Sequence, residues 1–154
     1  MTRWLSDAEQ VTWQSYIRMR QRLDSAIAAG LAQDGMSFSD YEVLVALSAA
    51  GGQLRAKELG AEICWDKSRL SKHLTRMSAR GLIDRCQAVE DARGREVRLT
   101  DAGRAALDAA APNHVELVRR LFIDDMTPAE AAALRSLAGR VVAEVERTDV
   151  EGIG

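Results

Sequence analysis

The hydrophobic period of the chain changes once and then changes back, and this limits the folds that the chain can adopt. Between Asp66 and Gly81, apolar side chains recur every three or four residues, as they do on one face of a helix. After Gly81 the segments LIDRCQAV and EVRLT alternate as strands do, and EDARGR joins them. From Thr100 the helical spacing returns. The pattern predicts a mainly α-helical protein with one small antiparallel β-hairpin.

Three segments of the form Ser/Thr-x-x-Glu predict where helices begin, because the two side chains can satisfy free backbone N–H groups. These capping boxes are Ser6 with Glu9, Ser39 with Glu42, and Thr127 with Glu130. They predict three helices, from about Ala8 to Ala29, from Asp40 to Ala49, and from Pro128 to about Arg147. Gly30 is a plausible stop for the first of them, because glycine often follows the last helical residue.

The middle of the chain predicts two more helices and a short extended piece at Leu54. A small helix should bury Leu59 and Ile63, and a second should run from Lys67 to Arg80, with Asp66 as its N-cap. Thr100 should cap a further helix, which Pro112 should bend or divide because proline cannot donate a backbone hydrogen bond.

Composition excludes several classes of protein. The 154 residues are 47% hydrophobic, which suits one soluble domain or two small lobes. No stretch resembles a signal peptide or a membrane span, and two cysteines make no disulfide framework, so we expect a cytoplasmic protein. The net charge is −2, but the part from Gln53 to Arg104 has 12 Lys and Arg against 8 Asp and Glu. This basic middle weakly indicates a polyanionic partner.

The predicted helix from Lys67 to Arg80 carries the strongest functional pattern. Leu70, His73, Leu74 and Met77 share one face. The opposite face carries hydroxyls and cations, namely Lys67, Ser68, Arg69, Ser71, Lys72, Thr75 and Arg76. A helix fits the major groove of DNA, where short hydroxyls approach base edges and cations neutralise phosphates. A solvated face with incidental charges is the alternative interpretation.

The tip of the predicted hairpin adds a second basic element. Gly94 lets the chain reverse between Arg93 and Arg95, and an arginine at such a tip can enter the narrow minor groove. A helix, a second helix with a basic face and a basic hairpin, in that order, are typical of a winged helix-turn-helix. Arg93 and Arg95 alone could merely increase solubility, but this order favours DNA contacts.

The segment DARGREVRLTDAG, from Asp91 to Gly103, resembles the wing of the MarR family of bacterial transcription regulators. SKHLTRMSARGLIDR resembles the recognition helix of that family, and SFSDYEVLVALSAAGGQLRAKELG resembles the helices before it. The segment MTPAE resembles the start of the family's last helix. The resemblance covers nearly the whole chain and adds Asp91 and Gly94 to the expected wing site.

The resemblance implies a homodimer that binds a pseudo-palindromic operator in double-stranded DNA. Residues 1–35 would form an N-terminal dimerisation helix, residues 36–104 the DNA-binding domain, and residues 105–154 the C-terminal dimerisation helices. The terminal segments carry more apolar side chains than a lone lobe can bury, which agrees with a dimer. A self-contained helical core is the alternative.

The resemblance also implies a switch, because many members are repressors that a small aromatic or phenolic anion releases. Such an effector binds between the dimer lobe and the winged domain. Trp13, Tyr16, Met19 and Arg20 could line the effector site in this chain. Aromatic residues at helical spacing more often pack in a core, so a dimer core is the better interpretation of these residues.

Other functions are less well supported. We expect no cofactor, no metal and no enzymatic activity, because no nucleophile has a visible base partner and only His73 and His114 could serve as histidine ligands. His73 should be a core or hydrogen-bonded histidine, and His114 could line an effector pocket or cap the Pro112 kink. Cys64 and Cys86 should be small buried hydrophobes. A winged-helix protein-interaction module and a redox regulator that uses Cys64 and Cys86 remain alternatives.

Overall fold

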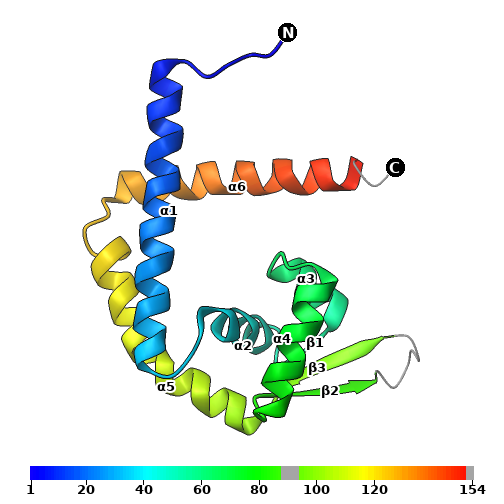
Figure 1. Cartoon of the computed structure of the whole chain (residues 1–154). Helices are drawn as coiled ribbons and strands as arrows, with labels where there is room; N and C mark the ends of the chain where they lie inside the picture. Colours follow the sequence, from blue (N-terminus) through cyan, green and yellow to red (C-terminus); the bar gives the residue numbers. More distant parts are fainter. Residues whose placement is uncertain (88–93, 152–154) are drawn as a thin grey trace. The chain divides into compact units, whose positions relative to one another are not determined.

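A computed structural model describes residues 1–87 and 94–151, and Figure 1 shows the order of the elements. The chain divides into two compact units, Met1–Leu117 and Val118–Gly154. The first unit contains, in order, α1 (Asp7–Gln33), α2 (Phe38–Ala49), β1 (Gln53–Arg55), α3 (Ala56–Glu62), α4 (Lys67–Ala79), β2 (Ile83–Gln87), β3 (Arg95–Leu99) and almost all of α5 (Asp101–Val118). The second contains the π-helix η1 (Arg119–Ile123) and α6 (Pro128–Glu151). The predicted fold class is confirmed.

Helix α1 begins as predicted but does not stop at Gly30. Ser6 Oγ accepts a hydrogen bond from Glu9 N (3.3 Å), and the Glu9 carboxylate accepts one from Ser6 N (2.8 Å). The helix continues to Gln33, and Gly35 follows it with φ +72°. A Cβ on Gly30 would lie 2.7 Å from Leu117 Cδ2, so this glycine makes room for a side chain of α5 within the helix.

Helix α2 uses a different cap from the predicted one. The side chain of Ser37, not Ser39, accepts a hydrogen bond from Asp40 N (3.0 Å), so the helix begins at Phe38. Ser37 and Asp40 have the same spacing as a capping box, which is why two overlapping starts were possible in the sequence. Gly51 and Gly52, both with positive φ, turn the chain after the helix.

The strands form a three-stranded antiparallel sheet in the order β1-β3-β2. Val97 in the central strand pairs with Leu54 of β1 and with Arg85 of β2. The hairpin of β2 and β3 is the predicted one. The extended piece at Leu54 was also predicted. Its position at the edge of the sheet was not predicted, because a three-residue strand is too short for its sequence to indicate which strand it pairs with.

Helix α5 is not divided by Pro112. Thr100 caps it as predicted, since Gly103 N donates to Thr100 Oγ1 (3.0 Å), and the same hydroxyl donates to Gly81 O (2.6 Å). Tertiary contacts hold the helix on both sides of the proline. Ala110 is fully buried before it, and after it Asn113 Nδ2 donates to Asp34 Oδ1 (2.9 Å).

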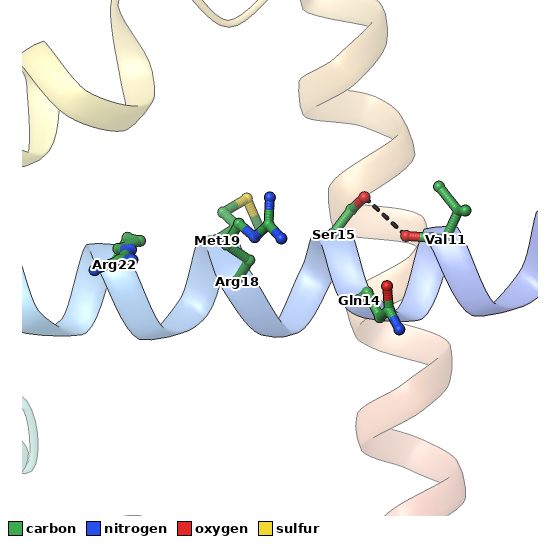
Figure 2. A pocket seen from close by; sticks show the side chains of 6 residues that line it. All are labelled: Val11, Gln14, Ser15, Arg18, Met19 and Arg22. Atoms are coloured by element: carbon green, nitrogen blue, oxygen red, sulfur yellow. Dashed lines mark hydrogen bonds between the residues drawn. The ribbon is translucent and has the colours of Figure 1, made fainter.

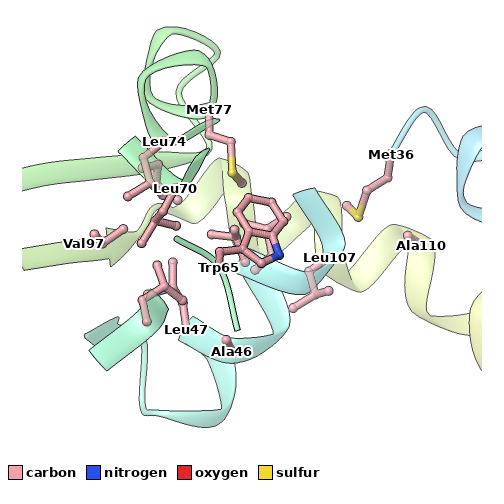
Figure 3. Packing of buried hydrophobic residues seen from close by; sticks show 14 of the residues in the cluster. Met36, Ala46, Leu47, Trp65, Leu70, Leu74, Met77, Val97, Leu107 and Ala110 are labelled. Atoms are coloured by element: carbon pink, nitrogen blue, oxygen red, sulfur yellow. The ribbon is translucent and has the colours of Figure 1, made fainter. Parts of the chain in front are cut away.

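One hydrophobic core joins the last turns of α1 to the winged part of the first unit. Figure 3 shows how side chains from α2, α4, β3 and α5 meet around Trp65. The large side chains that are less than 2% exposed include Leu31, Val43, Leu44, Leu47, Leu59, Leu74, Met77, Ile83 and Val97. This core fixes α4 against the sheet and leaves its other side free.

The second unit has no such core. Thr127 and Glu130 form the predicted capping box, with Thr127 N donating to the Glu130 carboxylate (2.8 Å) and Glu130 N donating to Thr127 Oγ1 (3.2 Å). Arg119 and Asp124 form an ion pair (2.8 Å) across η1. Of the residues whose burial is described in this unit, 118–148, none is buried. No helix in the described part of the chain is long and apolar enough to cross a membrane.

Candidate nucleic-acid interface

Helix α4 has one buried face and one exposed face. Asp66 accepts a hydrogen bond from Arg69 N (2.9 Å), which starts the helix, and Gly81 with φ +75° follows its end. Leu70, His73, Leu74 and Met77 are buried, as their spacing predicted. The helix is therefore anchored in the core by these four side chains, and the exposed side chains on its opposite face are accessible to a partner.

All seven residues predicted for the recognition helix lie on the exposed side of α4. They are Lys67, Ser68, Arg69, Ser71, Lys72, Thr75 and Arg76. Four of them are cations, and no acidic residue occurs between Lys67 and Arg80. The helix thus presents a compact surface of positive charge and hydroxyl groups, which is the chemistry that DNA recognition requires.

Arg69 is held in place by an aromatic ring. Its guanidinium lies 3.8 Å from the centre of the Trp65 ring, and Trp65 itself is only 8% exposed. A cation over the face of an indole is attracted by the ring's negative charge distribution. Arg69 also influences Glu42 of α2, where burial raises the pKa of the carboxyl and the charge of Arg69 opposes that shift. Arg69 is therefore oriented before any partner binds.

Thr75 connects the recognition helix to the sheet. Its hydroxyl donates to Ser71 O (3.0 Å) and accepts a hydrogen bond from Arg85 Nη1 on β2 (2.9 Å). Both hydrogen bonds are exposed to solvent. This contact ties the orientation of α4 to that of the hairpin.

A buried polar cluster lies beneath the recognition helix, and sequence reasoning found only part of it. Asp40 of α2 is 2% exposed and accepts hydrogen bonds from Arg80 Nη1 (2.8 Å) and Nη2 (2.7 Å). His73 was predicted to be a core or a hydrogen-bonded histidine, and it is both: it is buried, and its Nε2 lies 2.8 Å from Asp40 Oδ1. Arg76 Nη2 lies 3.0 Å from His73 Nδ1.

The carboxyl of Asp40 and the imidazole of His73 in this cluster both have shifted pKa values. Burial acts to raise the pKa of Asp40, but the hydrogen bonds and charges of Arg80 and His73 outweigh burial and hold it below its ordinary value. Burial lowers the pKa of His73 despite the opposing effect of Asp40. Asp40 is therefore ionised and His73 neutral at neutral pH. The missed signal was the position of Asp40 on the same stripe as Val43, Leu44 and Leu47, where an acid must find a buried partner.

The wing is described in part. Gly94 precedes β3, and Arg95 begins it with an exposed side chain. The predicted wing contacts Asp91 and Arg93 lie outside the described residues. Gln87 pairs with Arg95 in the last described pair of the hairpin.

The four residues predicted for an effector site lie exposed along α1. Trp13 and Tyr16 have ring centres 5.6 Å apart, and the Arg20 guanidinium lies 5.9 Å from the centre of the Tyr16 ring. A hollow of about 420 Å³ lies on the same helix. Figure 2 shows the side chains that line it, which are Val11, Gln14, Ser15, Arg18, Met19 and Arg22. Only Met19 belongs to both sets. A single helix lines this hollow, so it is an open surface and not an enclosed cavity.

The two cysteines are less buried than predicted, and His114 packs against another ring. Cys64 was predicted to be buried, but it is exposed in the turn between α3 and α4 with φ +55°, a conformation that this helix-turn-helix turn imposes. Cys86 is half-buried in β2. The His114 ring packs 4.5 Å from the Tyr41 ring, and its buried Nδ1 has no hydrogen-bond partner among the described residues. The described residues hold no group of three His, Cys, Asp or Glu side chains that could bind a metal.

Comparisons with known proteins point to one family. A sequence model of the MarR family matches residues 34–94. Among solved structures, the MarR family transcriptional regulator AbsC from Streptomyces coelicolor is 34% identical with a TM-score of 0.90, over 94% of this chain and 99% of AbsC. The MarR family regulator Sco3205 from the same organism, solved in complex with DNA, is 35% identical with a TM-score of 0.87, over 94% of this chain and 91% of its own.

A third structure shares the fold at lower identity. The regulator PcaV from Streptomyces coelicolor, solved with its natural ligand, is 22% identical with a TM-score of 0.74, over 92% of this chain and 98% of PcaV. At that identity the likeness shows the fold alone. A search of curated proteins found no match.

Proposed function

The chain belongs to the MarR family of transcriptional regulators, and from this membership we propose that it is a dimeric repressor that binds a specific operator in double-stranded DNA. The proposal assigns residues 36–104 to DNA binding and residues 1–35 and 105–154 to dimerisation. A small-molecule effector would relieve the repression.

The exposed face of α4 is the observation that carries this proposal. It combines four cations with three hydroxyl side chains on a helix whose other face is anchored in the core. Cations at the ends of this face would neutralise phosphates, while the shorter hydroxyls would approach base edges in the major groove. Sco3205, a relative with the same fold, is solved in complex with DNA.

The wing would supply a second kind of contact. Arg95, together with Arg93 and Asp91 of the loop and the adjacent Gly94, would lie near the minor groove next to the one that α4 occupies. An arginine in a narrow minor groove responds to groove shape and to its negative potential, and not to a particular base. The wing would therefore add affinity for many sequences, while α4 would choose among them.

Exposed apolar side chains on the terminal segments support the proposed dimerisation. Trp4 is 84% exposed, and other large apolar side chains that the single chain leaves exposed are Leu5, Val11, Leu121, Ile123, Leu137, Val141, Val142 and Val145. Apolar surface of this extent usually marks an interface. A two-fold dimer would present two α4 helices about 34 Å apart, which matches an operator with pseudo-palindromic half-sites.

An effector would act by favouring a spacing of the two α4 helices that does not fit DNA. A ligand that binds such a state more tightly shifts the population away from the DNA-bound state. Trp13, Tyr16, Met19 and Arg20 remain our candidates for contacts to an aromatic or phenolic ligand. PcaV, which shares the fold, is solved with its natural ligand.

Two alternatives predict different behaviour. A winged-helix module that binds protein would use Arg76 and Lys72 for a mixed interface, and its affinity would depend only moderately on salt. A redox regulator would use the thiols of Cys64 and Cys86, and oxidation would change DNA binding. The exposure of Cys64 makes its thiol accessible to oxidants, and its Sγ donates a hydrogen bond to Ala61 O (3.8 Å).

Selection of bound fragments from random duplex DNA tests the proposal most directly. We expect an enriched inverted repeat with half-sites about 10 base pairs apart, centre to centre. Affinity for that repeat should fall about 10³-fold or more between 50 and 200 mM salt, if about six or more phosphates are contacted. The absence of any enriched sequence, together with weak salt dependence, would favour the protein-interaction alternative.

Point variants divide the roles of α4 and the wing. Arg69→Ala or Lys72→Ala should weaken operator binding by about 1–3 kcal/mol, and the one that contacts a base should also relax specificity there. Arg95→Ala and Arg93→Ala should weaken binding to all duplexes alike. Arg135→Ala removes an exposed arginine from α6, outside the proposed DNA contacts, and as a control it should leave the DNA affinity of the assembled dimer unchanged. Equal losses of DNA affinity in the two α4 variants and the two wing variants, with specificity unchanged in all of them, would contradict the assignment.

A further inference from the structure

We infer that His73 is a positioning residue for DNA recognition, because its Nδ1 atom holds the Arg76 guanidinium on the exposed face of α4. The inference rests on the proposed function and adds to it a specific role for the buried cluster. His73 itself is 8% exposed and would touch no DNA. Its effect would pass through Arg76, which is exposed.

The contacts determine which nitrogen of His73 carries the proton. Arg76 Nη2 lies 3.0 Å from His73 Nδ1, and a guanidinium can only donate. Nδ1 must therefore be the acceptor and carry no hydrogen. The proton resides on Nε2, which donates to Asp40 Oδ1 at 2.8 Å.

Asp40 locks this tautomer from the other side of the ring. Its carboxylate is held by both terminal nitrogens of Arg80, at 2.7 and 2.8 Å, and it is buried. An ionised carboxylate can only accept, so the histidine nitrogen that faces it must be the donor. The Trp65 ring packs edge-on against the imidazole with ring centres 5.3 Å apart, which limits rotation of the ring. The lone pair on Nδ1 is thus directed by the core.

Orientation of Arg76 matters because a free arginine side chain has many rotamers. Ordering such a side chain on binding lowers affinity by about 2- to 10-fold, and prior order removes that loss. Arg76 donates a hydrogen bond to His73 through Nη2 alone. Its other guanidinium N–H groups can therefore contact DNA. The same acceptor therefore positions Arg76 without occupying it.

Protonation of His73 should release Arg76. A proton on Nδ1 would place a donor opposite a donor and add a like charge 3.0 Å from the guanidinium. The charged groups that face His73 are Asp40 from α2 and Arg76 and Arg80 from α4. Burial and the two arginines oppose protonation, while Asp40 favours it, and the pKa of His73 is lowered below 6.5. DNA affinity should therefore be constant near pH 7 and decrease only at more acidic pH.

Nitrogen-15 NMR on the full chain without DNA tests the tautomer. At neutral pH we expect His73 to be neutral with the proton on Nε2. A proton on Nδ1, or an imidazolium at neutral pH, would overturn the inference whether or not the chain binds DNA. This measurement therefore separates failure of the positioning role from failure of the proposed function.

Two substitutions of His73 test the role in binding. His73→Asn places an amide oxygen near the position of Nδ1 and keeps an acceptor for Arg76. His73→Gln places its amide nitrogen near Nε2 and keeps the donor to Asp40, but it removes the acceptor. We expect His73→Gln to weaken operator binding by about 2- to 10-fold and His73→Asn to retain most of the affinity. Neither asparagine nor glutamine titrates, so His73→Asn should also lose the decrease in DNA affinity at acidic pH. The other histidine, His114, is present in both variants and therefore cannot account for this loss.

A double-mutant cycle completes the test. In the Arg76→Ala background, His73→Gln should have no further effect on operator affinity. In the Lys72→Ala background it should have its full effect, because Lys72 forms no hydrogen bond or ion pair with His73 or with any other described residue. Thermal stability of every variant shows whether the folded state is retained at the assay temperature.

Each outcome decides between the two proposals. Equal affinities for His73→Asn and His73→Gln, or an effect of His73→Gln that persists without Arg76, would overturn the positioning role alone. A wild-type chain that binds no duplex at low salt would overturn the proposed function and this inference with it. Selective loss in His73→Gln that disappears without Arg76 supports both.

Discussion

The winged part of the chain and its C-terminal unit have similar hydrophobic spacing but opposite burial. Leu47 of α2 and Leu137 of α6 both lie on helical stripes of apolar residues. Leu47 is 0% exposed, whereas Leu137 is 52% exposed. The spacing of apolar residues thus predicts that a helix has an apolar face that must be buried. It does not predict whether this face packs against the same chain or against a second one.

This difference separates two sources of stability. The winged part is held by contacts within one chain, between α2, α4, β3 and α5. For residues 118–148, which include η1 and most of α6, the structure records local capping and ion pairs but no buried side chain. If the proposed dimer is correct, the second region gains its core only when two chains associate, so its stability should depend on protein concentration.

The largest expected effect comes from truncating the same residue type in the two regions. Leu47→Ala should lower the free energy of unfolding by about 2–5 kcal/mol at any protein concentration, because it leaves a cavity in a packed core. Leu137→Ala should change the stability of the dilute chain by less than about 0.5 kcal/mol and weaken association instead. Chemical denaturation at two concentrations and sedimentation equilibrium measure the two effects. If Leu137→Ala destabilises the dilute chain as much as Leu47→Ala, then Leu137 is covered within one chain.

Two glycines provide the next comparison. An added Cβ at Gly103 would lie 2.1 Å from Leu82 O, a backbone atom that cannot move aside, so Gly103→Ala should destabilise the winged part by about 1–3 kcal/mol or more. At Gly139 of α6 nothing lies within 4 Å, so Gly139→Ala should stabilise the helix by up to about 1 kcal/mol. Thermal unfolding of both variants gives the signs. Destabilisation by Gly139→Ala would reveal close packing against a second chain.

The smallest expected effects concern the helix caps. Ser37→Ala removes the cap of α2 and should lower global stability by about 1 kcal/mol, whereas Ser39→Ala, its control, should have almost no effect. Thr127→Ala removes the cap of α6 and should mainly accelerate amide hydrogen exchange in the first turn of that helix. A loss of stability with Ser39→Ala, but not with Ser37→Ala, would show that Ser39 caps α2, as the sequence predicted.

The recognition helix was predictable because its signals are local. Asp66, Gly81 and the apolar stripe from Leu70 to Met77 lie within one segment, and each acts through bonds or contacts a few residues away. The seven residues expected on its outer face are exposed for the same reason. The contact of His73 with Asp40 spans 33 positions, and that of Arg80 with Asp40 spans 40, so no local rule could pair them.

Errors in the prediction arose where tertiary contacts outweigh local preference. Gly30 has the composition of a helix stop, yet its lack of a side chain is used for close approach to Leu117. Pro112 was predicted to bend or divide α5, and the helix is not divided, because contacts on both sides of the proline keep it continuous. Cys64 should have been buried, but the turn of the helix-turn-helix places it in solvent.

The sequence by itself determined the order of helices and strands, the polar face of α4 and the resemblance to a family, because periodicity, caps and glycine positions act over a few residues. Only the tertiary structure decided which polar groups meet beneath that face. Buried hydrogen-bonding groups must find partners, and those partners come from whichever element the packing of the core brings within about 3 Å. The contacts of Asp40 with His73 and Arg80, which lie 33 and 40 positions away, therefore became visible only in the folded chain.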